Sequence, residues 1–433
     1  MEADARADGL AALIDTIYAL SSGAPPAAVA IVRISGPGAD RALRALTGTL
    51  AEPRRAELAM LRDNGQLIDN ALVIRFPGPA SATGEDVVEL HLHGGRAVVA
   101  AALAALGRIH GLRPAEAGEF TRRAFDNGRI DLAEAEGLAD LIEAETEGQR
   151  RAALALAGGA LSRQVGAWQA RLLALAAQVE AALDFSDEDD VAPLPAGFAG
   201  ALEALAGELA GWLARPGAER LRDGVRVVIA GPPNAGKSSL LNALIGRDAA
   251  ITSAMPGTTR DLIEAPTAIG GLPFLLIDTA GLRESDDSIE AIGVARAQAS
   301  VEAADILLWL GDPAAAPEGA IRVHSKADLG GEAGAAHVSV SATTGAGLAA
   351  LTRLLIQRSA ALLPAQGEVA LNARHRAALE AAQAALGEAV TTPDPIVTAE
   401  ALRRARVELD RISGRGGVED MLDALFGRFC IGK

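Results

Sequence analysis

The sequence predicts a multidomain fold: an amino-terminal α/β domain, an α-helical domain, and a P-loop α/β nucleotide-binding domain inserted into the helical one. Three observations predict it. Short apolar runs bounded by proline and glycine fill the first hundred residues, a G-x-x-x-x-G-K-S loop follows an apolar run at 225–230, and alanine- and leucine-rich helical patterning flanks that loop on both sides. We expect the domains to span 1–128, 129–221 with 362–433, and 222–361.

Composition limits the classes of protein that this chain can be. Half of the 433 residues are hydrophobic but only 3% are aromatic, and the abundant alanine favours helix. The formal charge of −16 argues against electrostatic binding of nucleic acid over the whole surface of the chain. A single cysteine excludes an internal disulfide, and no apolar run approaches 18 residues, so we expect a cytoplasmic protein without a membrane span.

The elements follow in order along the chain. Strands are predicted at 28–34, 71–76 and 86–91, because these apolar runs are bounded by Pro and Gly segments. A helix is predicted over 96–109, before Gly111. Helical patterning covers 132–185, resumes after an acidic loop until about 221, and returns at 371–388 and 398–412. Between these helices, 223–360 alternates strands and helices around a mainly parallel sheet.

The loop at 231–239 carries the most specific chemistry. Its backbone N–H groups are expected to wrap phosphates, and the helix that begins at Lys237 directs its positive end at them. Lys237 would neutralise the β and γ phosphates, and the Ser238 hydroxyl would ligate Mg²⁺. Four further motifs follow in the order and spacing of a GTPase: 258–261, 278–281, 326–328 and 341–342.

These motifs predict a guanine nucleotide. Asp278 would hold Mg²⁺ through water, Thr259 is the switch hydroxyl for Mg²⁺, and Asp328 would accept two hydrogen bonds that adenine cannot donate. The residues predicted at this site are Asn234, Ala235, Gly236, Lys237, Ser238, Ser239, Thr258, Thr259, Asp278, Thr279, Ala280, Gly281, Ser325, Lys326, Asp328, Ser341 and Ala342.

Three positions depart from the common GTPase pattern or invite two readings. Leu282 stands where many GTPases have the glutamine that orients the attacking water, so another group must do this, and the acidic stretch at 284–290 offers candidates. Ser325 replaces the usual asparagine of the base motif, which predicts weaker base affinity. Asn234 either stabilises a tight turn or ligates a monovalent cation that supplies the charge of an arginine finger.

Taken with its flanks, the chain resembles the tRNA modification GTPase MnmE (TrmE) family over nearly its whole length. The resemblance rests on the GTPase motifs with Asn234 and on four further segments: 31–37, 83–95, 118–129 and the terminal Phe-Cys-Ile-Gly-Lys at 429–433. It implies a folate-binding amino-terminal domain that forms a homodimer, a helical domain and an inserted GTPase domain. It also implies GTP hydrolysis activated by K⁺ and, with the flavoprotein MnmG, modification of the wobble uridine of certain tRNAs at C5.

The resemblance also implies roles for individual residues. A tetrahydrofolate derivative, 5-formyl- or methylene-tetrahydrofolate, supplies the one-carbon unit and would contact Arg33, Glu89, Arg129 and Lys433. The implied K⁺ ligands are Asn234, Ser253, Met255 and Thr258, which adds Ser253 to the nucleotide site. Glu290 falls at the water-orienting glutamate, and Cys430 at a cysteine needed for modification, so that the expected catalytic residues are Lys237, Glu290 and Cys430.

Several alternatives stay open at this stage. Cys430 also fits an inert thiol. His91 and His93 fit packing, or the lining of the folate site, better than a metal. The arginines at 113, 122, 123 and 129 fit either a solvated face or an anionic-ligand site. The chain as a whole also admits a ribosome-assembly GTPase, or a folate-dependent one-carbon transferase with a regulatory GTPase domain. Such assembly GTPases usually carry a basic RNA-binding module, whereas this chain is acidic.

Overall fold

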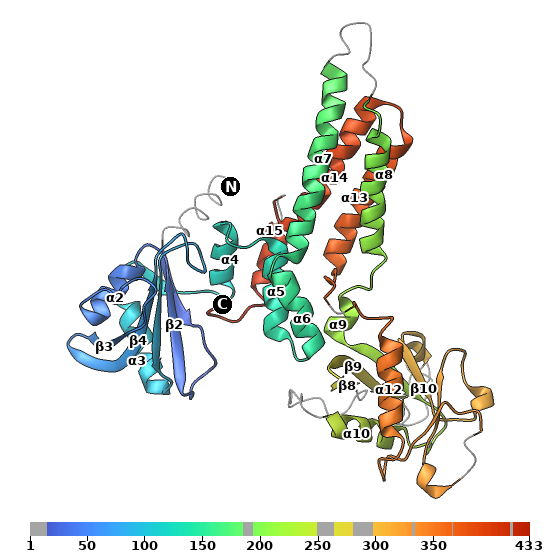
Figure 1. The fold of residues 1–433 in the computed structure, drawn as a ribbon. Coiled ribbons are helices and arrows are strands. Elements are labelled where there is room, and N and C mark those ends of the chain that lie inside the picture. The colour runs from blue at the N-terminus through green and yellow to red at the C-terminus, as the bar shows by residue number, and fades with distance from the viewer. Residues whose placement is uncertain are drawn as a thin grey trace, which may run out of the picture. The chain divides into compact units, whose positions relative to one another are not determined.

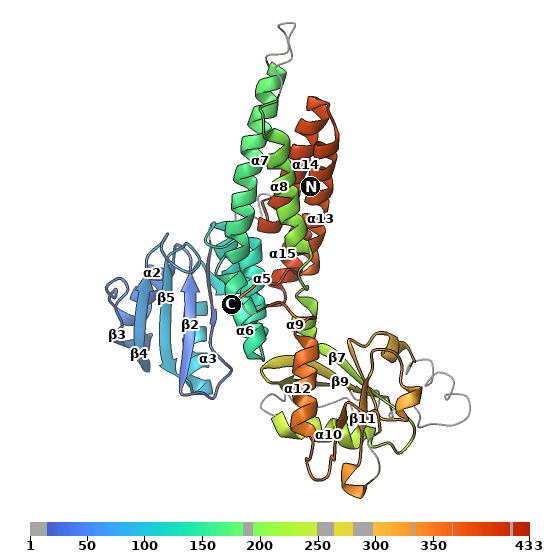
Figure 2. The same ribbon diagram turned by 45° about the vertical axis from the view of Figure 1, so that its right-hand side comes forward.

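The computed structural model describes residues 15–184, 194–248, 264–279, 298–330, 334–365, 367–415 and 419–433. Its contacts divide the chain into two compact units (Figures 1 and 2). Unit 1 comprises residues 1–139 and 413–433, and unit 2 comprises residues 140–412. Residues 413–433, which the sequence analysis assigned to the helical domain, therefore group with the amino-terminal unit.

Unit 1 is built on a six-stranded mixed sheet in the order β3-β4-β5-β2-β1-β6. All neighbouring strands are antiparallel except β1 and β6, which are parallel. The strands are β1 (Thr16–Leu20), β2 (Val29–Ser35), β3 (Glu57–Asp63), β4 (Gln66–Phe76), β5 (Val87–His93) and β6 (Leu112–Pro114). The three predicted strands are present as β2, the second half of β4, and β5, whereas β1, β3 and β6 were not predicted.

Two helices cover one face of this sheet. They are α2 (Ala39–Thr47) and α3 (Arg96–Gly107), and the apolar residues of both join one core with the strands. Strand β2 shows the reason for the pairing, because Ala30, Val32 and Ile34 alternate into that core while Arg33 faces the other side. The predicted helix over 96–109 is confirmed as α3, which ends two residues earlier.

The carboxy-terminal helix of unit 1, α15 (Glu419–Phe426), packs on its two remaining helices. These are α4 (Glu119–Asp126) and the first part of α5 (Leu132–Glu143). Leu422, Leu425 and Phe426 form a small apolar core with Leu132 and Ala135. Gly118 is required at the contact, because a Cβ there would lie 2.2 Å from the carbonyl oxygen of Phe426.

Unit 2 contains a helical bundle and the nucleotide-binding module. The bundle helices are α6 (Glu147–Ala157), α7 (Ala160–Asp184), α8 (Phe198–Leu213), α13 (Ala373–Thr391) and α14 (Pro395–Ser413). In both views α7, α8, α13 and α14 run side by side, so that helices from before and after the module share one bundle (Figures 1 and 2). Trp168 of α7 is fully buried there, edge-on to Trp212 of α8, with ring centroids 5.4 Å apart.

The nucleotide-binding module is a six-stranded sheet in the order β12-β11-β10-β7-β9-β8, parallel except at β8. The strands are β7 (Val225–Ala230), β8 (Glu264–Ile269), β9 (Leu272–Asp278), β10 (Ile306–Trp309), β11 (Ile321–His324) and β12 (Val338–Ser339). Its helices are α9 (Glu219–Asp223), α10 (Lys237–Asp248), α12 (Leu348–Ser359) and two short 3-10 helices, Pro313–Ala315 and Ala327–Leu329. The predicted mainly parallel sheet is confirmed.

Candidate nucleotide and amino-terminal sites

The phosphate loop lies where the central strand β7 ends and α10 begins. Gly231 starts it at φ +148°, and a Cβ there would lie 3.1 Å from the Leu310 carbonyl carbon, so only glycine fits beside β10. Asn234 and Gly236 both adopt left-handed conformations, at φ +59° and +91°. The loop thus turns sharply and presents the first residues of α10 at the carboxyl edge of the sheet, where ligands bind in such folds.

The predicted phosphate and magnesium groups meet at this edge. Lys237 is 7% exposed, and its Nζ donates to the carbonyl oxygens of Gly231 and Pro232 at 3.0 and 2.9 Å. The Ser238 hydroxyl donates to the carboxylate of Asp278, which is fully buried at the end of β9. A hydroxyl and a carboxylate are oxygen ligands of the kind that Mg²⁺ prefers, so these residues fit the predicted cation.

Thr279 stabilises this arrangement at the ends of the strands. Its hydroxyl donates to the Ile229 carbonyl at 2.9 Å, which ties the end of β9 to the end of β7. Ser239, by contrast, is exposed on α10.

The base motif contacts the phosphate loop directly. The Ser325 hydroxyl donates to the Ala235 carbonyl and the Lys326 Nζ donates to the Asn234 carbonyl, both at 2.7 Å. Asp328 is exposed, as a carboxylate that reads a base must be before ligand binds. Ser341 is buried, and its hydroxyl accepts from the Thr344 N–H at 3.1 Å, which shapes the turn that carries Ala342.

Part of the predicted GTPase site lies outside the described residues. These positions are Ser253, Met255, Thr258, Thr259, Ala280, Gly281 and Glu290. The two remaining groups, the phosphate loop with Asp278 and the base motif, come together in the module as the sequence analysis expected.

In unit 1, Arg33 and Glu89 lie opposite each other on β2 and β5. The Arg33 Nε donates to the Glu89 carboxylate at 3.0 Å, and the guanidinium lies 5.6 Å from the centre of the Phe120 ring. The His91 Nε2 lies 3.4 Å from the other Glu89 oxygen. Two of the four residues predicted to bind folate therefore form one half-buried pair, with an aromatic ring beside it that the sequence analysis did not single out.

The carboxy-terminal tail lies next to the same strands. Gly432 has φ +98°, and a Cβ on it would lie 2.1 Å from the Leu20 carbonyl oxygen, so the tail packs directly on the end of β1. Ala117 and Ile431 form an isolated antiparallel bridge. Ala19, the residue before Leu20 on β1, pairs with Arg33 on β2. The docked tail therefore brings the exposed Cys430 and Lys433 to the part of unit 1 that contains Arg33.

Arg129, the fourth residue predicted to bind folate, is exposed, and its Nε donates to the Ser81 carbonyl at 3.2 Å. The neighbouring Asn127 donates to the Thr83 carbonyl at 2.8 Å. Gly84 is close-packed here, since a Cβ on it would lie 2.9 Å from the Asn127 Cβ. The segments 83–95 and 118–129 therefore meet at this point.

Arg123 lies neither on a solvated face nor in an anionic-ligand site, which were the two alternatives left open for the arginines at 113, 122, 123 and 129. It is 3% exposed, and its guanidinium donates to Asp15 at 2.6 Å, Glu119 at 3.0 Å and Glu85 at 3.2 Å. Arg113 pairs with Asp15 and Glu119 as well. These two arginines hold carboxylates inside the domain, while Arg122 pairs with the exposed Asp423 at 2.7 Å.

The pKa values of this cluster reflect the pairing. Burial lowers the pKa of Arg123, but the charge of Glu85 and the hydrogen bonds to Asp15 and Glu119 raise it above its ordinary value. Burial likewise raises the pKa of Glu119, and the hydrogen bonds from Arg113, the Glu116 N–H and Arg123 outweigh it, so the net shift is downward. Arg123 and Glu119 are therefore both charged at neutral pH.

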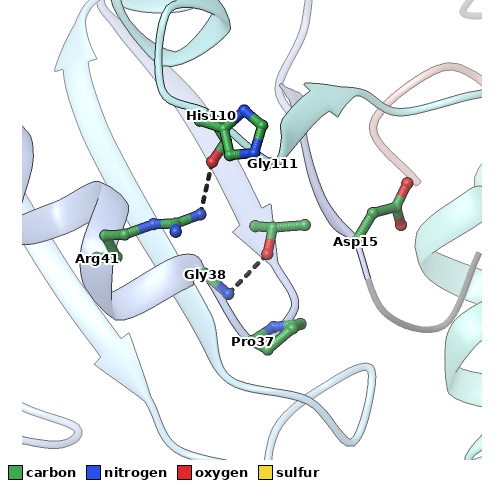
Figure 3. A pocket seen from close by; sticks show the side chains of 7 residues that line it. Asp15, Pro37, Gly38, Arg41, His110 and Gly111 are labelled. Carbon is green, nitrogen blue, oxygen red and sulfur yellow. Dashed lines mark hydrogen bonds between the residues drawn. The ribbon is translucent and has the colours of Figure 1, made fainter.

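Figure 3 shows a pocket of about 420 Å³ on another part of unit 1, lined by Asp15, Thr16, Pro37, Gly38, Arg41, His110 and Gly111. Its polar groups largely bond one another: Arg41 donates to the His110 carbonyl at 2.6 Å, and the Gly38 N–H donates to the Thr16 hydroxyl at 2.7 Å. None of the predicted folate residues lines it.

Metal-ligand clusters and membrane-spanning helices are both absent from the described part of the chain. Among those residues no three His, Cys, Asp or Glu side chains are grouped to hold a metal ion, and His93 instead pairs with Asp69 at 2.8 Å. None of the described helices is long and apolar enough to cross a membrane.

A mainly parallel sheet with a phosphate loop, a hydrogen-bonded Ser–Asp pair at its carboxyl edge and a base motif on that loop define a P-loop GTP hydrolase. Two family models match the chain: "GTP-binding protein TrmE N-terminus" over residues 16–129 and "MnmE helical domain" over residues 132–430. The chain belongs to the tRNA modification GTPase MnmE family. The predicted family and fold class are thereby confirmed.

Curated relatives match over nearly the whole length. The tRNA modification GTPase MnmE of Rhizorhabdus wittichii is 62% identical, and the match covers 97% of this chain and 97% of that relative. The tRNA modification GTPase MnmE of Erythrobacter litoralis is 58% identical, and the match covers 97% of this chain and 100% of that relative. Among solved structures, the G domain of the T. maritima FeoB iron transporter is 27% identical, covers 31% of this chain and 98% of its own, and has a TM-score of 0.23.

Proposed function

We propose that this chain is a K⁺-activated GTPase that acts with MnmG to modify C5 of the wobble uridine in certain tRNAs, using a tetrahydrofolate one-carbon unit. The observation that carries the proposal is that one chain, matched over 97% of its length by MnmE relatives, combines a GTPase site with a separate charged site in its amino-terminal unit. We further propose the three-domain division at 1–128, 129–221 with 362–433, and 222–361, and a cytoplasmic location.

On the nucleotide side, Lys237 contacts the phosphates, and Ser238 and Thr259 ligate Mg²⁺. A monovalent cation is held by Asn234, Ser253, Met255 and Thr258. The exposure of Asn234 supports this role, because its amide side chain is accessible on the loop just before the phosphate-binding turn. Glu290 orients the attacking water, and the cation supplies positive charge where charge develops in the transition state.

On the amino-terminal side, Arg33, Glu89, Arg129 and Lys433 contact the folate, which supplies a one-carbon unit when bound. The Arg33–Glu89 pair supports this role, because it is half-buried and presents a cation and a carboxylate together to a ligand that carries polar ring groups and a carboxylate tail. Cys430 is exposed on the docked tail, as a thiol that reacts with a substrate must be.

The test is steady-state GTP hydrolysis in K⁺ and in Na⁺ at matched ionic strength. We expect K⁺ to raise the rate at least tenfold, about 1.4 kcal/mol of transition-state stabilisation. Asn234→Ala should abolish the K⁺ response and leave nucleotide binding within about threefold, because the phosphate loop binds mainly through its backbone and Lys237. Equal rates in K⁺ and Na⁺ for the unmodified protein would refute the cation mechanism.

We also propose that the amino-terminal unit forms a homodimer through strand β3. This edge strand exposes Leu58 (74%) and Met60 (54%) on the face opposite the core, and Leu67 on β4 adds a third exposed apolar side chain (55%). An exposed apolar edge strand is a ready surface for pairing with a second copy.

The paired substitution Leu58→Glu with Met60→Glu should weaken the dimer at least 100-fold, because each lost side chain contributes about 1.5–3 kcal/mol. Sedimentation equilibrium measures this directly. Leu154→Glu, at a leucine that is 51% exposed on α6, is the matched control and should leave the dimer intact. An unchanged dimer in the paired variant would remove β3 from the interface.

A further inference from the structure

The base motif holds two consecutive carbonyl groups of the phosphate loop. Ser325 follows strand β11, and its hydroxyl reaches 90 residues back along the chain to the Ala235 carbonyl at 2.7 Å. The next residue, Lys326, places its Nζ 2.7 Å from the Asn234 carbonyl. The Lys326 side chain also lies across the loop, since a Cβ on Gly236 would be 3.7 Å from its Cε. We call these contacts of Ser325 and Lys326 the loop clasp.

The loop clasp holds the part of the phosphate loop whose backbone conformation is least favourable. Asn234 is a non-glycine residue at φ +59°, a conformation that costs roughly 1 kcal/mol or more. Ala235 lies between it and Gly236, which is also left-handed at φ +91°. Such a backbone persists only where its surroundings determine it, and the Ser325 and Lys326 bonds determine the orientation of both amides that flank Ala235.

The direction of these bonds matters for phosphate binding. The amide that joins Ala235 to Gly236 is planar and trans, so its N–H points opposite to its carbonyl. Holding the Ala235 carbonyl on Ser325 therefore turns the Gly236 N–H away from the base motif. Backbone N–H groups at this point of a phosphate loop are the ones that receive the phosphate oxygens.

We propose that Ser325 is a positioning residue for the phosphate loop and not a reader of the base. A serine hydroxyl has one proton to donate, and here that proton is donated to the Ala235 carbonyl. This inference revises the expectation that serine at this place weakens base recognition. The inference rests on the proposed function, because it concerns the same nucleotide-binding site. Whether that site binds a guanine nucleotide at all is tested separately, by GDP binding to the unmodified protein.

The experiment is calorimetric titration of the full-length protein with GDP and with inosine diphosphate, in Mg²⁺. Hypoxanthine lacks the exocyclic amine of guanine but keeps O6 and N7, so the ratio of the two affinities reports reading of that amine, and a titration with inorganic pyrophosphate, which has no base, reports the loop alone. Ser325→Ala should weaken GDP, inosine diphosphate and pyrophosphate by the same factor, about fivefold for one lost hydrogen bond. Ser325→Thr keeps the hydroxyl and should restore the affinity. Asp328→Ala should instead bring the ratio towards one.

Ser339→Ala is the matched control, because it removes a hydroxyl from the neighbouring strand β12 that lies 3.3 Å from His324 and not on the loop. It should bind both nucleotides as the unmodified protein does. The proposal is overturned if Ser325→Ala weakens the nucleotides but not pyrophosphate, if it weakens neither nucleotide, or if threonine fails to restore the affinity. Thermal melting without nucleotide separates any loss of folding from loss of loop position.

Discussion

Lys237→Ala is expected to lower kcat/KM for GTP hydrolysis by roughly 100- to 1000-fold, as the loss of a principal phosphate-stabilising group does in other enzymes. Lys237 is the first residue of α10, and its ammonium lies inside the loop on the Gly231 and Pro232 carbonyls. It is thus held within the loop that receives phosphate. Alanine there removes the positive charge that offsets the developing negative charge on the transferred phosphoryl group.

Single-turnover hydrolysis of GTP in K⁺ measures the effect, with thermal melting of the nucleotide-free protein as a folding check. Arg353→Ala is the matched control, because it removes an exposed cation from helix α12 of the same module. A Lys237→Ala rate within tenfold of the unmodified rate would show that this lysine does not stabilise the transition state.

Arg123→Met is expected to lower the free energy of unfolding of unit 1 by about 3–5 kcal/mol, the usual cost of leaving buried charges unpaired. Arg123 is nearly fully buried and bonds Asp15, Glu85 and Glu119, which come from three separate places in the sequence. Methionine is close in volume, so the expected loss is electrostatic and not a cavity effect. Urea denaturation of the full-length protein, followed by a probe in unit 1, gives the value.

Arg122→Met is the matched control from the adjacent position. Its partner Asp423 is 70% exposed, so the pair should contribute at most about 1 kcal/mol. A loss for Arg123→Met no larger than that of Arg122→Met would contradict the structural role of the network.

The same network predicts how stability depends on pH. The folded-state pKa of Glu119 lies below its ordinary value of 4.5. Its contribution is therefore complete above pH 4.5 and is lost as the pH falls through the folded-state pKa, where Glu119 becomes protonated. Unfolding free energy measured between pH 7 and pH 3 should fall in the acidic part of that range, and the fall should be smaller in Arg123→Met.

Much of the fold could be predicted because its signals are local. The phosphate loop is a contiguous motif after an apolar strand, and strand β2 is an apolar run bounded by proline and glycine segments. Strand β3 was missed because two of its three large apolar side chains, Leu58 and Met60, face solvent and only Leu61 is buried, so its pattern does not resemble a half-buried strand. Strands β1 and β6 are short, and β6 joins the sheet only through β1.

One signal in the sequence could have found the sites more directly. The chain contains three lysines among its 40 cationic residues, and these are Lys237, Lys326 and Lys433. Two lie at the phosphate loop and the third on the docked tail, whereas the described ion pairs within both units use arginine or histidine. Arginine suits bidentate pairing with carboxylates, and lysine acts as a point charge.

The sequence by itself determined the family, the GTPase chemistry and the order of the domains, because motifs and hydrophobic periods are properties of neighbouring residues. Only the tertiary structure decided which distant groups meet. Ser325 reaches Ala235, Arg123 gathers Asp15 and Glu85, and Gly432 docks on Leu20. These pairings depend on strand order and on the packing of helices, and buried polar groups must find their partners wherever the fold brings them.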